Sequence, residues 1–204
     1  MEEIKEMLEK ISEKKLIILI AITLILIIIM IGLIIRNSLY KKYAEEAQKT
    51  YDKVHELYYF GGDISYEQDE SNERIFIEKD ENKYYLISNF DESVKKYFSE
   101  KKLSDVLEFL DIVKKDNNYY AKDFGRGISY YYGTTLKTKK ANSKKRVFIA
   151  ESKFCKINHQ VSYGDGCEGN NEYIISKEFV TVKINDVWVV DKYTSIFEMD
   201  KEIK

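Results

Sequence analysis

The fold of this chain is decided by twenty consecutive uncharged residues, LIILIAITLILIIIMIGLII, at positions 16–35. At about 1.5 Å of rise per residue, a helix of this length covers the ~30 Å hydrocarbon core of a bilayer. So many isoleucines and leucines favour insertion by about 5 to 10 kcal/mol, which Thr23 and Gly32 cannot offset. Every face of such a helix is apolar, which argues against a helix buried in a soluble core. We therefore predict a transmembrane helix that contacts membrane lipid through residues 16–35.

The residues around the apolar run determine whether it is retained and how it is oriented. A cleaved signal peptide has a shorter apolar region and a small-x-small site, and Ile31–Arg36 offers none. Basic residues nearly balance on the two sides, so charge alone does not set the orientation. Long domains are exported largely regardless of charge, and Lys14-Lys15 adjoin the membrane in a short tail. We expect a single-pass protein of the cell membrane, with residues 1–15 cytoplasmic and the soluble part outside.

Composition limits the classes of partner. The net charge is −2 with 33% charged residues, so the surface is mixed and has no basic field to attract nucleic acid. The part beyond the membrane has about 165 residues, close to the usual size of one domain. We expect one soluble domain that does not bind nucleic acid.

Helical periodicity continues on both sides of the apolar run. In the tail, apolar residues recur at helical spacing: Ile4, Met7, Leu8 and Ile11. They predict a short interfacial helix within residues 1–15. Beyond the membrane, a stripe from Leu39 to Tyr58 predicts a juxtamembrane helix at 36–58 that ends at Gly61-Gly62. This stripe packs on its own domain or, alternatively, forms the seam of a homodimer.

Residues 59–204 are predicted to form an α+β domain, which begins with a hairpin and two short helices. The β-rich runs Arg74–Ile77 and Tyr84–Ile87 flank a turn-forming segment and predict the hairpin. Asp91 and Ser104 precede apolar residues at helical spacing and are the expected N-caps of the helices.

The second half of the domain reads mainly as strand. A second hairpin is expected to turn at Asp116–Asn118. Four further strands are predicted at roughly Thr134–Thr138, Arg146–Ile157, Tyr173–Ile184 and Trp188–Val190, the last after an Asn185-Asp186 turn. Helices followed by a meander of strands predict an α+β domain in which a few helices pack on an antiparallel sheet.

A search for catalytic motifs returns mostly negatives. The two histidines are His55, in the juxtamembrane helix, and His159, in a loop. The sequence has no Gly-x-Ser-x-Gly elbow, no HExxH motif and no phosphate-binding glycine-rich loop with its lysine. Solvated faces explain nearly all carboxylates. We therefore expect no catalytic residue and no cofactor.

Cys155 and Cys167 flank a loop rich in Gly, Asp and Asn between two predicted strands. A disulfide would stabilise the fold by roughly 3 kcal/mol and would persist only in an oxidising compartment, which suits an exported domain. The alternatives are two free thiols and a metal site, which lacks a fourth ligand at a familiar zinc spacing. The residues of that metal site would be Cys155, His159, Cys167 and either Asp165 or Glu168.

The order of elements resembles a known family. A helix, Gly61-Gly62, a hairpin and then Tyr84–Asp91 leading into Val94–Ser99 are similar to the IseA-type inhibitors of bacterial cell-wall D,L-endopeptidases. The likeness continues through the second helix, the Lys115–Tyr120 hairpin and Gly125–Gly127. It covers roughly residues 47–190 as a pattern of elements.

The resemblance implies a non-catalytic α+β domain of Gram-positive bacteria that binds NlpC/P60-type hydrolases at the wall and occludes their catalytic cleft. Members of this family are secreted, whereas this chain keeps a membrane anchor. An inhibitor needs a rigid exposed surface, which loops with glycine and aromatic residues on a sheet can supply. The candidate partner-binding residues are Gly125, Arg126, Gly127, Tyr130 and Tyr131. Alternatively, the glycines form a turn and the tyrosines fill the space between sheet and helix.

Two other functions fit the sequence. A cone-shaped domain of the nuclear-transport-factor-2-like kind has a similar order of helix and curved sheet; it would have a pocket and would bind a small ligand, itself or an envelope partner. A weaker alternative is an enzyme that uses the neighbourhood of Cys155, His159 and Asp165.

Overall fold

The computed structural model describes residues 2–123, 131–155 and 172–201, and the chain forms two compact units, Met1–Lys42 and Tyr43–Lys204. Helix α1 spans Glu2–Phe60 and belongs to both units. It forms all of the first unit that the structure describes, and its last part, from Tyr43, is the first element of the second unit. The side chains of residues 16–35 are all exposed to solvent. The first unit therefore presents a helix that is long and apolar enough to cross a membrane.

The last part of α1 is a core helix of the folded unit. The predicted stripe is buried there from Ala47 on: Ala47, Tyr51, Val54 and Tyr58 are buried, together with Leu57, whereas Leu39 is 43% exposed. This part of the stripe packs on its own domain, which is the first of the two interpretations. Gly61 and Gly62 end the helix as expected, with φ of 80° and 55° and with N–H groups that donate to the carbonyls of Leu57 and Glu56.

A small antiparallel sheet follows. Its strands are β1, Phe76–Lys79; β2, Asn82–Leu86; β3, Val113–Lys115; and β4, Asn118–Ala121, in the order β1-β2-β4-β3. Both predicted hairpins are confirmed. Each turns through two residues with positive φ, Asp80-Glu81 in one and Asp116-Asn117 in the other, a conformation that short polar residues tolerate in tight hairpins.

Three short helices separate the two hairpins: α2, Phe90–Ser93; η1, Lys95–Tyr97; and α3, Glu100–Phe109. The expected N-caps were wrong. Asp91 lies inside α2, and Ser104 lies inside α3. The cap of α3 is Ser99, whose hydroxyl oxygen accepts a hydrogen bond from the Lys102 backbone N–H at 3.3 Å. The helix begins earlier than expected because Ser99 satisfies one of its free N–H groups.

The second sheet is the predicted meander. Its strands are β5, Tyr131–Ala141; β6, Lys145–Cys155; β7, Glu172–Ile184; and β8, Val187–Lys192, paired antiparallel in chain order. The predicted strands are confirmed, although β5 begins three residues earlier than expected. A final helix, α4, Ile196–Asp200, was not foreseen; Ser195 and Glu198 form a capping box at its start.

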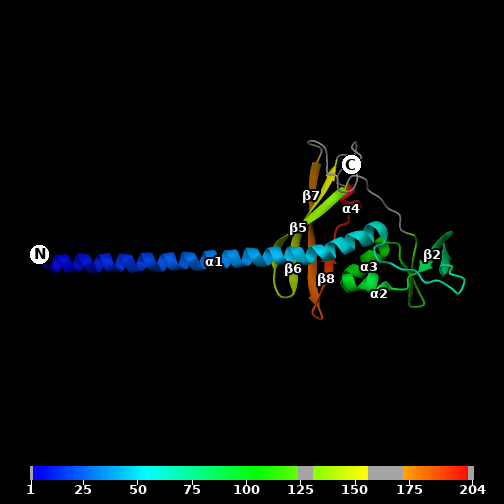
Figure 1. Ribbon diagram of the computed structural model, residues 1–204, viewed down its shortest axis with the longest axis horizontal. Coiled ribbons are helices and arrows are strands. Elements are labelled where there is room, and N and C mark those ends of the chain that lie inside the picture. The colour runs from blue at the N-terminus through cyan, green and yellow to red at the C-terminus, as the bar shows by residue number, and fades with distance from the viewer. Residues whose placement is uncertain (1, 124–130, 156–171, 202–204) are drawn as a thin grey trace. The chain divides into compact units, whose positions relative to one another are not determined.

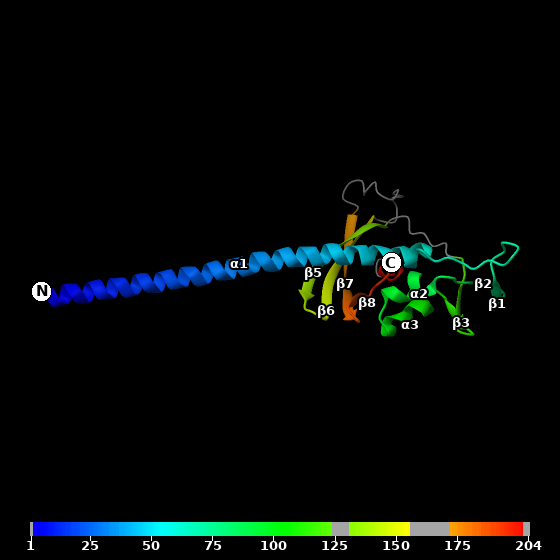
Figure 2. The same cartoon turned by 60° about the horizontal axis from the view of Figure 1, so that its bottom comes forward.

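The core of the folded unit lies between α1 and the second sheet. Figures 1 and 2 both show the cyan part of α1 crossing one face of this sheet. Phe148, Phe179 and Val190 of the sheet are buried in the same cluster as Tyr51. The unit is an α+β domain, and the crossing of α1 over β5 positions the site described next.

Candidate functional site

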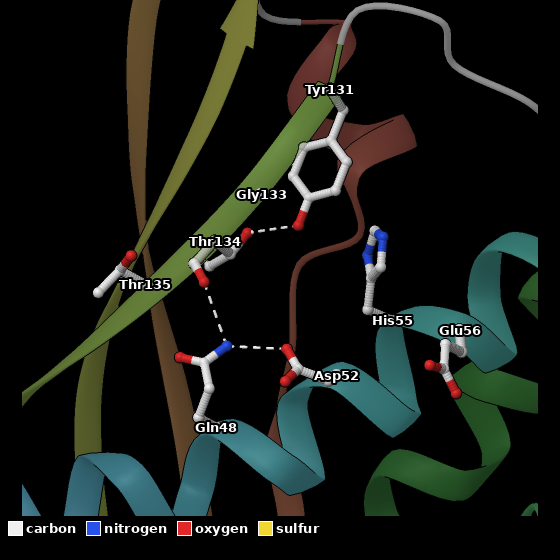
Figure 3. A pocket seen from close by; sticks show the side chains of 8 residues that line it. All are labelled: Gln48, Asp52, His55, Glu56, Tyr131, Gly133, Thr134 and Thr135. Atoms are coloured by element: carbon white, nitrogen blue, oxygen red, sulfur yellow. Dashed lines mark hydrogen bonds between the residues drawn. The ribbon is translucent and has the colours of Figure 1, made fainter. Parts of the chain in front are cut away.

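The candidate site is a hollow of about 590 Å³ between α1 and the start of β5 (Figure 3). Helix α1 supplies four of its lining residues and strand β5 the other four. They are Gln48, Asp52, His55 and Glu56 from α1, and Tyr131, Gly133, Thr134 and Thr135 from β5. A space of this size fits a small molecule or one long side chain.

Gln48 joins the helix to the strand at one side of the hollow. Its Nε2 donates hydrogen bonds to the Thr134 carbonyl at 3.1 Å and to Asp52 Oδ1 at 2.8 Å, and its Oε1 accepts from the Leu136 N–H at 3.0 Å. Among the described residues, β5 is the edge of its sheet, so its outer backbone groups face no described strand there. The Gln48 carboxamide takes that strand's place and holds the wall of the hollow in position.

A cluster of hydroxyl groups lies behind this wall. Thr134 Oγ1 is 2.8 Å from the Tyr131 hydroxyl, 2.8 Å from Ser152 Oγ and 3.2 Å from the Tyr51 hydroxyl. Tyr51 and Ser152 are buried, and burial raises the pKa of Tyr51, so its phenol stays neutral. The cluster fixes the direction of the Tyr131 ring, which faces the hollow in Figure 3.

His55 stands in the hollow between aromatic rings. Its ring centroid is 4.7 Å from that of Tyr131 and 5.6 Å from that of Tyr59. Burial lowers the pKa of His55 to about 4, and the nearby charge of Glu56 opposes this only weakly. At neutral pH the imidazole is therefore uncharged, with Nδ1 at 3.5 Å from the Tyr193 hydroxyl.

Two carboxylates give the hollow its charge. Asp52 and Glu56 both line it from α1, one helical turn apart. Desolvation raises the pKa of Asp52, against the hydrogen bond from Gln48, and the charge of Glu56 raises it further. Glu56 also accepts a hydrogen bond from Lys53 Nζ at 3.1 Å.

A second hollow of about 350 Å³ shares His55 and Glu56 with the first. It extends along the end of α1 and is also lined by Tyr59, Phe60, Gly62 and Asp63. Together the two hollows form a groove along α1 that contains three carboxylates, a neutral imidazole, phenol rings and amide groups. No lysine or arginine is among the described residues that line it. This groove suits a ligand that is positively charged or rich in hydrogen-bond donors.

The structure places only some of the residues that the sequence singled out. Tyr131 is buried in the wall of the hollow. Gly125, Arg126, Gly127 and Tyr130 lie outside the described residues. Across the described ranges, no three His, Cys, Asp or Glu side chains gather where they could hold a metal ion.

Cys155 is fully buried at the end of β6 and is disulfide-bonded. Cys167, its partner in the sequence-based prediction, lies outside the described residues together with His159, Asp165 and Glu168. The pairing of the two cysteines, like the alternative metal site, stays a prediction.

Sequence reasoning missed most of the hollow. Gln48, Asp52 and Glu56 recur every fourth residue on α1, immediately beside the buried stripe. A row of polar residues next to a row of buried apolar residues on a helix indicates a solvent-accessible boundary of the core. This signal could be read from the sequence. The strand that forms the other wall could not be identified from the sequence, because only the fold brings residues 131–135 against residues 48–56.

The comparisons with known proteins leave the family open. No protein-family model matches the chain, and a search of curated proteins finds no match.

Proposed function

We propose that this protein is a single-pass membrane protein whose folded domain binds a ligand outside the cytoplasm and catalyses no reaction. The observation that carries the proposal is the hollow between α1 and β5, which is lined by oriented polar groups and held open by Gln48. A helix that crosses a sheet and leaves a lined hollow is what a cone-shaped domain of the nuclear-transport-factor-2-like kind would have. The apolar length of residues 16–35 supports the anchor, and the short lysine-bearing tail supports a cytoplasmic N-terminus.

The chemistry of the lining favours a cationic ligand, such as an amine or a basic side chain of a partner protein. Asp52 and Glu56 supply negative charge, and the Tyr131 ring offers a face on which a cation is stabilised. His55 remains neutral and does not repel a positive group. An anionic ligand would meet the carboxylates of Asp52 and Glu56, of which Glu56 is paired with Lys53 at 3.1 Å from outside the lining.

The state of His55 supports a binding role over a catalytic one. A general base works best when its pKa lies near the operating pH, and that of His55 is about 4. Its Nδ1 lies within reach of the buried Tyr193 hydroxyl. The histidine therefore contributes a flat neutral surface to the hollow.

Native mass spectrometry of the full chain, purified in detergent from its own membranes, tests the proposal. We expect a bound cationic molecule that is retained by the wild type and lost in Asp52→Lys, because the new ammonium group occupies the hollow. Glu108→Lys is the matched control, because Glu108 is exposed on α3 and does not line the hollow. A bound species that survives Asp52→Lys, or a wild type that carries none and binds no amine, would count against it.

A second candidate is inhibition of cell-wall D,L-endopeptidases of the NlpC/P60 type. It is supported by the resemblance to the IseA-type inhibitors and by the order of elements, in which Gly61-Gly62 ends a helix and the hairpins β1-β2 and β3-β4 bracket the short helices α2, η1 and α3. We expect the full chain in detergent to slow a purified D,L-endopeptidase at stoichiometric concentration. Arg126→Glu should weaken that inhibition and Glu108→Lys should not. If several such enzymes run at full rate, this candidate is excluded.

A further inference from the structure

Two neighbouring hairpin turns of the second sheet form a surface that the proposed ligand site does not use. One is the β5–β6 turn, residues 142–144, and the other is the β7–β8 turn, residues 185–186. The Lys183 N–H donates to the Lys144 carbonyl at 2.9 Å, so the turns lie side by side, and both are at the lower end of the sheet in Figure 1. We call this end of the sheet the turn face.

The turn face combines exposed apolar side chains with lysines. Ile184 and Val187 form the pair that closes the β7–β8 turn, and they are 43% and 57% exposed. The exposed lysines at the adjacent turn are Lys140, Lys144 and Lys145. The acidic residue of the β7–β8 turn, Asp186, is paired with Lys183 at 2.8 Å. Exposed apolar side chains surrounded by lysines are typical of surfaces that bind anionic membranes.

A stacked arginine ties the turn face to the first residues of the folded unit. The Arg146 guanidinium lies over the Tyr43 ring at 3.9 Å and over the Trp188 ring at 4.1 Å, and it pairs with Glu46 at 2.9 Å. Arg146 is the second residue of β6 after the β5–β6 turn, and Trp188 is the second residue of β8 after the β7–β8 turn. Both turns are therefore fixed to Tyr43, where the folded unit begins.

The length of chain between the apolar segment and Tyr43 limits where the turn face lies. Seven residues lie between Ile35 and Tyr43, and the eight steps from one to the other span about 12 Å as a helix and at most roughly 28 Å if fully extended. The turn face contacts Tyr43, the residue at which this short connection joins the folded unit. Trp188, at this end, belongs to the residue type enriched at membrane interfaces.

We propose that the turn face docks on the lipid surface, with Ile184 and Val187 among the headgroups and the lysines on anionic phosphates. Docking would hold the folded domain in one orientation to the membrane instead of leaving it free to tumble on its connection. This inference rests on membrane insertion of residues 16–35, which the proposed function also requires, but it does not depend on the hollow or its ligand.

Trp188 allows a direct test because it is the only tryptophan of the chain. The full chain is placed, one copy per disc, in nanodiscs of phosphatidylcholine and phosphatidylglycerol with or without brominated acyl chains, which quench nearby tryptophan. We expect brominated lipid to quench Trp188 strongly, and the quenching to fall when phosphatidylglycerol is omitted. Co-elution of the chain with the discs reports the anchor separately, so that failure of insertion and failure of docking are distinguishable.

Two double variants and one control sharpen the test. Ile184→Asp with Val187→Asp should abolish most of the quenching, and Lys144→Glu with Lys145→Glu should remove its dependence on phosphatidylglycerol. Ile174→Asp is the matched control, because Ile174 is 51% exposed on the same strand but ten residues away, at the other end of the sheet. Equal emission with and without bromine in discs that contain the chain would overturn the proposal. Shielding of Trp188 that appears in discs loaded with two copies of the chain, and that does not depend on bromine, would also overturn it and would assign the face to a second copy.

Discussion

The Leu136 backbone N–H donates to Gln48 Oε1 at 3.0 Å, so a helix side chain occupies the open edge of strand β5. The same carboxamide donates to the Thr134 carbonyl at 3.1 Å. An edge strand usually exposes such groups to water or to other chains. Here one glutamine bonds two of these edge groups, and it also forms one side of the candidate binding site.

Gln48→Ala should therefore destabilise the folded unit by about 1 to 3 kcal/mol, because two partly buried backbone groups of β5 lose their partner. Denaturant unfolding of the full chain in detergent, followed by Trp188 fluorescence, measures the loss. Lys49→Ala changes the adjacent exposed residue and should leave the free energy of unfolding unchanged. Equal stability of the two variants would show that water replaces the carboxamide without cost.

The hydroxyl cluster behind the hollow supports a second prediction. Thr134 Oγ1 is shared by Tyr51, Tyr131 and Ser152. Thr134→Val keeps the shape of the side chain but removes the oxygen, so we expect a loss of about 1 to 3 kcal/mol in the free energy of unfolding. Thr135→Val, at the exposed neighbouring position, should cost far less. If the two substitutions cost the same, the cluster contributes nothing beyond ordinary strand packing.

The sequence predicted local structure well wherever a single short-range interaction decides it. The hairpin turns at Asp116-Asn117 and Asn185-Asp186 were located correctly because adjacent short polar residues tolerate the positive φ that a tight turn needs. The apolar length of residues 16–35 needed no tertiary information either. The end of α1 at Gly61-Gly62 followed from the same kind of local reasoning.

The candidate site could not be predicted in this way because its two walls are about eighty residues apart in the chain. Gln48 contacts Thr134 only because α1 crosses the sheet. The periodicity of neither segment indicates that the two segments pack together. Tyr131 was expected on a partner-binding surface, and its packing beside His55 follows from that same crossing. The polar row of α1 was visible, but its partner strand was not.

Helix capping shows how tertiary contacts shift a local signal, and it provides a third prediction. Ser104 was the expected cap of α3, yet Ser99 is the cap, and its hydroxyl also donates to Asp191 Oδ1 at 2.8 Å. Ser99→Ala should cost about 1 to 2 kcal/mol, because it removes the cap and the bond to β8 together. Ser104→Ala, inside the helix and exposed, should be neutral or slightly stabilising, since alanine is the better helix former. Thermal unfolding of both variants decides between the two caps, and a larger loss for Ser104→Ala would contradict this assignment.

His55 predicts the pH dependence of stability. Its pKa is lowered by burial from 6.5 to about 4 in the folded chain, so between these values the unfolded chain binds a proton that the folded chain excludes. Stability is therefore unaffected by His55 above pH 6.5 and falls as the pH decreases below it, by up to about 1.4 kcal/mol per pH unit until about pH 4.

Unfolding of the full chain in detergent between pH 7.5 and pH 4.5, compared with His55→Gln, isolates this contribution. The carboxylates whose pKa is lowered by lysine partners, such as Glu178 and Asp186, also destabilise the fold in acid, but they do so equally in both proteins. We expect the wild type to lose stability more steeply than His55→Gln over this range, with the two curves parallel above pH 6.5. Parallel curves throughout would mean that His55 keeps its ordinary pKa in the folded chain, and the lowered pKa assigned to it in the hollow would be wrong.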